Sequence, residues 1–289
     1  MAVRKDLYIP LPNGGSLDTR AELYNCAEDV VTDCKHRSVR ISDYELGSLD
    51  KSWCGVESYD EALSLLKTGY QSTVDEFRKE LSVEPSDGTR FSFKNNIQGF
   101  APIVPLALKC VPNSMVCMDM KPIKAKVLDI YYDMTVLAGT SPDEIIKAGQ
   151  AILGAIIDLE KQGYRFNLYA VQTYCRGDKN DTVDILCVKV KSSSKPLDLK
   201  RMSFPLTHPA FFRVIGFDWQ GKSPITRDVG WGRGRDFCKE HSDYSQLMIT
   251  KLFGSNAHYL SGSQVIRSKY DREKLKESFK NGYTKKEPA

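Results

Sequence analysis

The residues best suited to hold a metal ion are Asp133 and Thr135. Residues 125–136 alternate between two faces, which predicts a buried strand that ends near Asp133. A hard cation such as Mg²⁺ prefers oxygen ligands, and alternate side chains converge at a strand end, so these two residues form a candidate Mg²⁺ site. The next alternate residue after Asp133 and Thr135 is Leu137, which has no ligating atom. The alternative is that Asp133 and Thr135 accept backbone N–H donors at the strand end.

Two further residues belong to types that enzymes use in hydrolysis. Asp129 lies four residues before Asp133 on the same strand face, and paired carboxylates can hold the ions of a two-metal nuclease. No further acidic partner stands at a useful spacing, so the alternative is that Asp129 pairs with a nearby lysine. His208 precedes a proline and could act as a catalytic base, but no Ser or Cys stands out in the sequence as the nucleophile it would activate. The alternative is that His208 caps a helix or lies in the core. These patterns leave catalysis open and favour a protein that is not an enzyme.

A candidate nucleic-acid interface lies nearer the C-terminus. Residues 230–235 interleave glycines with Trp231, Arg233 and Arg235, and an aromatic ring beside cations is typical of single-strand binding. Residues 262–289 carry an excess of four basic side chains, which equals the formal net charge of +4, so the basicity of the chain belongs to this tail. Contact with phosphates is one interpretation. A tight glycine loop around a packed Trp231, and a solvated helix face in the tail, are the alternatives.

The composition is that of a globular protein. The chain has 289 residues, of which 41% are hydrophobic and 27% charged, and this excludes a disordered or fibrous protein. No stretch approaches the length of a membrane helix, and the N-terminus has no apolar signal-peptide core, so we expect no membrane partner. The eight cysteines stand at no regular spacing and include no CxxC, and a disulfide framework would need a secreted protein, so we expect reduced thiols in the cytoplasm.

The first ninety residues are predicted to be helical. One helix is expected within residues 16–33, and another begins at Ser58, where Ser58 and Glu61 form a capping box. Residues 99–122 are apolar but interrupted by prolines, which lack an amide donor. This pattern predicts a connection with short helical turns that packs against the core.

The clearest pattern is strand, helix, strand, turn and strand over residues 125–191. The helix begins at the capping box of Ser141 and Glu144 and ends at Gly163. Strand, helix and strand form a right-handed parallel unit, and the short turn makes the third strand antiparallel. We expect that strand to form the sheet edge, protected by Lys189 and Lys191.

This order resembles the von Willebrand factor A-like arrangement, a Rossmann-type α/β fold. The resemblance implies a mostly parallel sheet with an antiparallel edge strand, flanked by helices. A-type domains hold a divalent cation with Asp-x-Ser-x-Ser, of which Asp133 and Thr135 match the first two positions. The expected organisation is a helical N-terminal region (1–90), an A-like core (91–220) and a C-terminal extension with a basic tail (221–289).

Residues 50–235 contain several short segments whose sequences and order along the chain resemble those of a known family. They include Gly99-x-x-Pro102-x-Val104-Pro105, Leu159-Glu-x-x-Gly163-Tyr164 and His208-Pro-Ala-x-x-Arg213. In this order they resemble a family of uncharacterised proteins encoded mainly by bacteriophages and related mobile elements. The resemblance implies a phage protein made in the cytoplasm of the bacterial host, with association with the virion as a further option. It carries over no catalytic residue.

The sequence leaves three hypotheses about function. The first is a non-enzymatic interaction module whose A-like core binds a phage or host protein, with Mg²⁺ at Asp133 and Thr135 as an optional bridge. The second is a nucleic-acid-binding protein that uses Trp231, Arg233, Arg235 and the basic tail. The third is a metal-dependent nuclease that uses Asp129 and Asp133.

Overall fold

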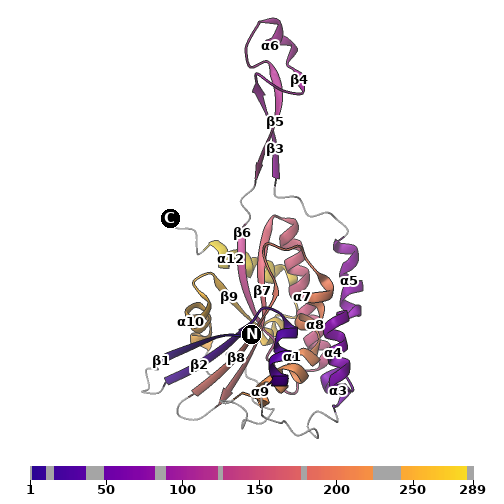
Figure 1. Cartoon of the computed structure of the whole chain (residues 1–289), viewed down its shortest axis with the longest axis vertical. Helices are drawn as coiled ribbons and strands as arrows, with labels where there is room; N and C mark the ends of the chain where they lie inside the picture. The colour runs from indigo at the N-terminus through magenta and orange to yellow at the C-terminus, as the bar shows by residue number, and fades with distance from the viewer. Residues whose placement is uncertain are drawn as a thin grey trace.

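The chain forms a mixed α/β structure with two separate sheets (Figure 1). The computed structural model describes residues 2–10, 16–36, 49–81, 89–122, 126–176, 181–223 and 242–284. The larger sheet has six strands in the order β1-β2-β8-β7-β6-β9, and the smaller has three in the order β3-β5-β4. The strands of the larger sheet are β1 (Val3–Pro10), β2 (Ser16–Tyr24), β6 (Lys126–Asp133), β7 (Tyr164–Arg176), β8 (Asp181–Lys191) and β9 (Ala257–Ser261).

Helices cover both faces of the six-stranded sheet, and together they form what we call the body. The helices are α1 (Ala27–His36), α3 (Lys51–Cys54), α4 (Tyr59–Thr68), α5 (Gln71–Leu81), α7 (Pro142–Lys161), α8 (Leu199–Thr207), the π-helix η1 (Phe211–Gly216), α9 (Phe217–Gly221), α10 (Ser242–Phe253), α11 (Gly262–Arg267) and α12 (Arg272–Thr284). Most of them share one apolar cluster, whereas α10 packs on the opposite face with Met248 and Ile249.

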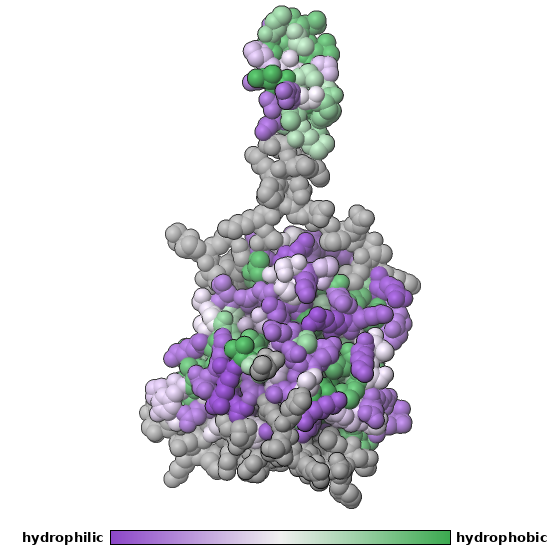
Figure 2. All heavy atoms as spheres, viewed as in Figure 1, coloured by the Kyte–Doolittle hydropathy of each residue, from purple (hydrophilic) through white to green (hydrophobic). Residues whose placement is uncertain are grey.

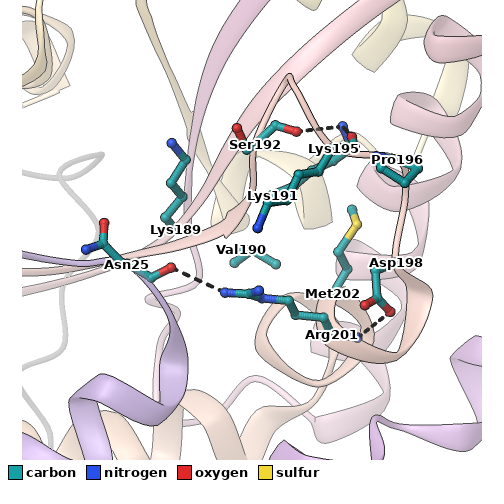
Figure 3. Close-up of a pocket in the computed structure, with 10 residues that line it drawn as sticks. All are labelled: Asn25, Lys189, Val190, Lys191, Ser192, Lys195, Pro196, Asp198, Arg201 and Met202. Carbon is teal, nitrogen blue, oxygen red and sulfur yellow. Dashed lines mark hydrogen bonds between the residues drawn. The ribbon is translucent and has the colours of Figure 1, made fainter.

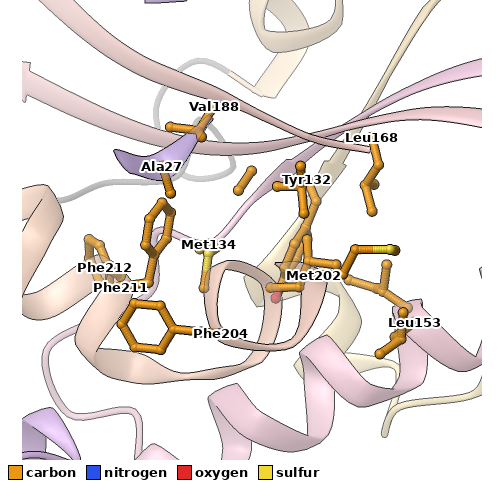
Figure 4. Packing of buried hydrophobic residues seen from close by; sticks show 14 of the residues in the cluster. Ala27, Tyr132, Met134, Leu153, Leu168, Val188, Met202, Phe204, Phe211 and Phe212 are labelled. Atoms are coloured by element: carbon orange, nitrogen blue, oxygen red, sulfur yellow. The ribbon is translucent and has the colours of Figure 1, made fainter. Parts of the chain in front are cut away.

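The main core lies between the sheet and helices α7 and α8 (Figure 4). Phe204 and Phe211 are fully buried with their ring centroids 5.9 Å apart, and Leu153 packs in the same cluster. Helices α7 and α8 cross closely at Gly149, where an added Cβ would stand only 2.1 Å from the carbonyl oxygen of Leu206. The apolar face of α7 is therefore held by direct backbone contact as well as by side-chain burial.

The predicted strand–helix–strand unit is confirmed. Strands β6 and β7 are parallel neighbours joined by α7, and β8 runs antiparallel to β7. Ser141 accepts from the Glu144 amide while the Glu144 carboxylate accepts from the Ser141 amide, which is the expected capping box. Gly163 follows the helix with φ of +88°, a conformation that glycine adopts without strain.

The predicted helix at residues 16–33 and the predicted sheet edge at β8 are both wrong, and strand β2 is the reason for both. Residues 16–24 form strand β2, not the start of a helix, and β2 pairs in parallel with β8, so β8 is not an edge. Arg20 and Glu22 of β2 are polar, yet both are buried and form an ion pair. The burial of Glu22 also involves a residue far along the chain, since the Trp219 indole donates to its carboxylate over 2.9 Å. The helical prediction holds for α1, α3, α4 and α5.

The C-terminal helix also differs from its prediction. The expected exposed basic helix is α12, but Leu275 and Phe279 are buried, and the Phe279 ring lies 6.3 Å from the ring of Phe166. Arg272 pairs with Asp158 of α7 over 2.8 Å. Strand β9 joins the sheet beside β6. The six strands of the sheet therefore come from all three expected regions, 1–90, 91–220 and 221–289.

Candidate functional site

Residues 89–122 form a projecting hairpin that we call the arm. Its strands are β3 (Thr89–Asn96), β4 (Ala101–Pro102) and β5 (Met115–Pro122), and a short helix α6 (Val104–Leu108) lies at the tip. Strands β3 and β5 pair antiparallel along their whole length. Figure 1 shows the arm standing away from the six-stranded sheet. The expected helical turn is therefore present, whereas the expected packing of this segment against the core is wrong.

The arm exposes large apolar side chains. Among the described residues, seven of the twelve exposed large hydrophobic side chains belong to it: Phe93, Ile97, Phe100, Val104, Leu108, Val111 and Met118. Leu108 is 80% exposed and Phe100 is 65% exposed. Figure 2 shows the apolar colouring gathered at the tip. A contiguous apolar surface of this kind marks an interaction site, because nothing in the fold of the arm buries it.

Backbone hydrogen bonds hold the tip in one shape. The Ile103 amide donates to the Ser114 carbonyl over 2.6 Å, and the Phe100 amide donates to the Val116 carbonyl over 3.0 Å. An added Cβ at Gly99 would stand 2.1 Å from the same Val116 oxygen, so this close approach requires glycine. The apolar side chains are thus displayed on an ordered scaffold, which lowers the entropy cost of binding.

The arm is also basic by sequence. It contains Arg90, Lys94, Lys109 and Lys121 against the single acidic residue Asp119. Of these residues, Lys94 and Lys109 are described and exposed, and a surface that is apolar at its tip and carries these two positive charges favours a partner with an apolar recess and acidic surroundings.

The predicted metal residues Asp133 and Thr135 are fully buried and belong to one hydrogen-bond cluster. One Asp133 carboxylate oxygen accepts from the Thr135 amide over 2.9 Å. The other accepts from the hydroxyls of Thr173 (2.9 Å) and Tyr259 (2.7 Å). The Thr135 hydroxyl in turn accepts from the Thr173 amide over 2.9 Å. The two residues therefore bind β6, β7 and β9 to one another at the carboxyl ends of β6 and β9.

This arrangement does not fit a resident Mg²⁺ ion as it stands. Both carboxylate oxygens of Asp133 are occupied by protein donors, and the side chain has no exposed surface. Leu137, at the third position, is 57% exposed and has no ligating atom. A cation here would have to displace three donors, so the geometry favours the backbone-accepting interpretation and Mg²⁺ binding stays a prediction.

The residues considered for hydrolysis are engaged in other contacts. Asp129 accepts from the Asn167 amide nitrogen over 2.6 Å, so its partner is an asparagine and not the expected lysine. The His208 Nδ1 accepts from the Ala210 amide over 3.2 Å, and its ring meets the edge of the Tyr70 ring at 4.7 Å. Burial lowers the pKa of His208 to about 4. Across the described residues, no three His, Cys, Asp or Glu side chains are grouped to hold a metal ion.

The candidate nucleic-acid residues Trp231, Arg233 and Arg235 lie outside the described residues. Sequence reasoning missed the arm as a surface, although residues 99–122 are visibly apolar. Their prolines were taken to exclude a central strand, whereas β5 pairs with both β3 and β4, and its proline stands at the end of the strand. Within the part of the chain that the structure describes, no helix has the length and apolarity needed to cross a bilayer.

Comparison with known families gives one match. The model of a domain of unknown function, DUF7192, matches residues 18–261, a span that includes both the arm and the Asp133 cluster. No curated protein and no solved structure matches the chain.

Proposed function

Because the chain belongs to the DUF7192 family, whose function is unknown, we propose its function from the geometry: it is a non-enzymatic interaction module that binds a protein partner through the tip of the arm. The observation that carries this proposal is the exposure of Ile97, Phe100 and Leu108 on a segment whose backbone is held by its own hydrogen bonds. Exposing these side chains to water is unfavourable, and burying them in a partner recovers roughly 25 cal/mol per Å².

The partner surface that fits the tip is an apolar recess with acidic residues at its rim. Apolar side chains would fill the recess, while the exposed Lys94 and Lys109 match the rim. A protein fits better than the interior of a bilayer, because Gln98 and Asn113 lie exposed between the apolar residues. Their amide groups need hydrogen-bond partners, which a protein surface offers and hydrocarbon does not.

We further propose an A-like core and a phage context for this module. The order β8-β7-β6-β9, with only β8 antiparallel, supports the A-like arrangement. Strands β1 and β2 extend that arrangement beyond its usual edge. The sequence resemblance supports a phage-encoded protein acting in the host cytoplasm, with a partner among virion components, the replication machinery or host factors.

The first experiment captures the tagged protein from infected cells, with and without nuclease, and identifies its partners by mass spectrometry. The partner is then purified and its Kd measured for the wild type, for Phe100→Ser/Leu108→Ser, and for Leu247→Ser as a control. Leu247 is an exposed leucine of α10 in the body, so its substitution matches the chemistry at another site. We expect the double substitution to weaken binding at least about tenfold, since central apolar anchors dominate interfaces, and the control to leave it unchanged.

Two results would contradict this proposal. A partner that binds the double variant as tightly as the wild type would show that the tip is not the interface. Loss of every partner on nuclease treatment would favour the nucleic-acid alternative and direct attention to Trp231, Arg233 and Arg235.

A cation-assisted form of the proposal places Mg²⁺ between the partner and Asp133 with Thr135. It is tested in the same binding assay by replacing Mg²⁺ with EDTA. Because both residues accept protein donors, the geometry supports the form without a cation, and we expect the Kd to be the same in EDTA.

A further inference from the structure

A cavity of about 470 Å³ lies at the carboxyl end of β8 (Figure 3). It is bordered by the last residues of β8, by the turn that follows β8 and by the first turn of α8. Asn25, the residue after β2, closes one side. Since β2 and β8 are parallel neighbours, the carboxyl ends of both strands meet here. Ligands of α/β proteins are commonly bound at the carboxyl ends of parallel strands.

The lining is strongly basic. Four of the ten lining residues are cationic, namely Lys189, Lys191, Lys195 and Arg201, and only Asp198 is acidic. The Asp198 carboxylate caps α8 by accepting from the Arg201 amide over 3.2 Å. Lys191 is paired with Glu160 and Lys189 stands over the Tyr169 ring, so Lys195 and Arg201 are the cations that raise the electrostatic potential of the hollow and favour an anion.

The buried Lys191 makes the cavity an ordered site. Its ammonium pairs with Glu160 over 2.7 Å and donates to the carbonyls of Ser192 (3.2 Å) and Lys195 (3.1 Å). These bonds fix the turn that carries Lys195, so the Lys195 side chain starts from a defined position. Lys191 itself is charge-compensated, which leaves the exposed Lys195 and Arg201 to meet a ligand.

The cavity also has an apolar floor. Val190 and Met202 are almost fully buried and lie between the basic side chains, as Figure 3 shows. The Arg201 guanidinium is held near the floor by a long contact of 3.4 Å with the Asn25 carbonyl. A planar guanidinium with several donors is suited to bind a phosphate through two hydrogen bonds.

We propose that this cavity binds a small organic phosphate, the size of a nucleoside monophosphate, with its phosphate on Arg201 and Lys195 and its body on Val190 and Met202. The volume lies within the range of small-molecule sites, which is roughly 300–1,000 Å³. The apolar floor distinguishes this ligand from a bare inorganic anion, and the basic rim distinguishes it from a neutral molecule.

The test is direct binding of AMP, adenosine and inorganic phosphate to the full chain by isothermal titration calorimetry. AMP is expected to bind at least about tenfold more tightly than either adenosine or phosphate alone, because only AMP uses both halves of the site. The variant Lys195→Ala/Arg201→Ala is expected to weaken AMP binding by at least about tenfold. Lys200→Ala is the matched control, since Lys200 is an exposed lysine of the same helix that does not line the cavity.

The outcomes separate clearly. Absence of AMP binding, or binding that the double variant leaves intact, overturns the proposal, and so does an equal loss in Lys200→Ala. Equal affinity for phosphate and AMP overturns the role of the apolar floor. If a 5′-phosphorylated oligonucleotide competes with AMP, the phosphate source is a nucleic-acid end. If the oligonucleotide does not compete, the source is a free metabolite. Arm variants are expected to retain AMP binding, so this result does not depend on the proposed function.

Discussion

The body and the arm treat apolar residues in opposite ways. In the body, Phe204 and Phe211 are fully removed from water, whereas Phe100 and Leu108 of the arm are 65% and 80% exposed. Burial stabilises the body, but the same residue types in the arm contribute little to its own fold. The arm keeps its shape through backbone hydrogen bonds instead, as between Ile103 and Ser114. Its apolar residues are therefore best explained by a partner, and the comparison can be tested by removing side chains from each region.

The largest expected effect is on the stability of the body. Phe211→Ala leaves a cavity in the main core and is expected to lower the free energy of unfolding by about 3–5 kcal/mol. Leu108→Ala is expected to change it by less than about 0.5 kcal/mol, because Leu108 is mostly in water. Urea unfolding followed by circular dichroism measures both. A loss of several kcal/mol in Leu108→Ala would show that the tip supports the fold and would remove the contrast.

The second effect is on pH dependence and belongs to the body alone. Burial lowers the pKa of His208 to about 4, against a usual value near 6.5. Between these values the unfolded state binds a proton that the folded state does not, so stability falls as the pH falls from 6.5 towards 4. The full shift corresponds to about 3 kcal/mol as an order of magnitude.

This effect is measured by comparing urea unfolding at pH 7 and pH 5 in the wild type and in His208→Asn. We expect the wild type to lose stability over this interval and the variant to lose less, whatever its stability at pH 7. Equal losses in the two proteins would mean that His208 is not the group that titrates.

The same contrast shows which parts of the structure a sequence can predict. Helix α7 was predictable because its signals are local: Ser141 and Glu144 cap one end and Gly163 follows the other. Strand β2 was not, because burying Glu22 depends on Trp219, almost two hundred residues later in the chain. An apolar segment likewise does not reveal what it packs against. For this reason residues 99–122 suggested a connection packed on the core, although they belong to the arm and include its exposed tip.

The lysines at the end of β8, which line the cavity, were misinterpreted for a related reason. Alternating Lys189 and Lys191 suggested edge protection, a correct rule applied to a strand that has a neighbour on both sides. With β2 in place, Lys191 is buried against Glu160 and Lys189 stands over the Tyr169 ring at 5.8 Å. Both residues then line a cavity that depends on the correct strand order.

A smaller effect tests how far local signals stabilise the body. Ser141→Ala removes the side chain that accepts from the Glu144 amide at the start of α7. We expect a loss of about 1 kcal/mol, typical of an N-cap, while Ser141→Asp, which preserves the acceptor, should retain most of the stability. Thermal unfolding of the three proteins checks the order. A loss of several kcal/mol in Ser141→Ala would mean that the cap affects packing of the whole helix against α8.

The smallest expected effect concerns Mg²⁺ and asks whether the body is complete without a ligand. The Asp133 carboxylate already accepts from Thr135, Thr173 and Tyr259, so a cation gains little by displacing them. A ligand that binds only the folded state raises its stability, and we expect Mg²⁺ in place of EDTA to change the free energy of unfolding by less than about 0.5 kcal/mol. A larger gain that disappears in Asp133→Asn would support the cation-assisted form of the interaction. No gain would leave the body satisfied by its own groups, with the arm as the region whose apolar surface still requires a partner.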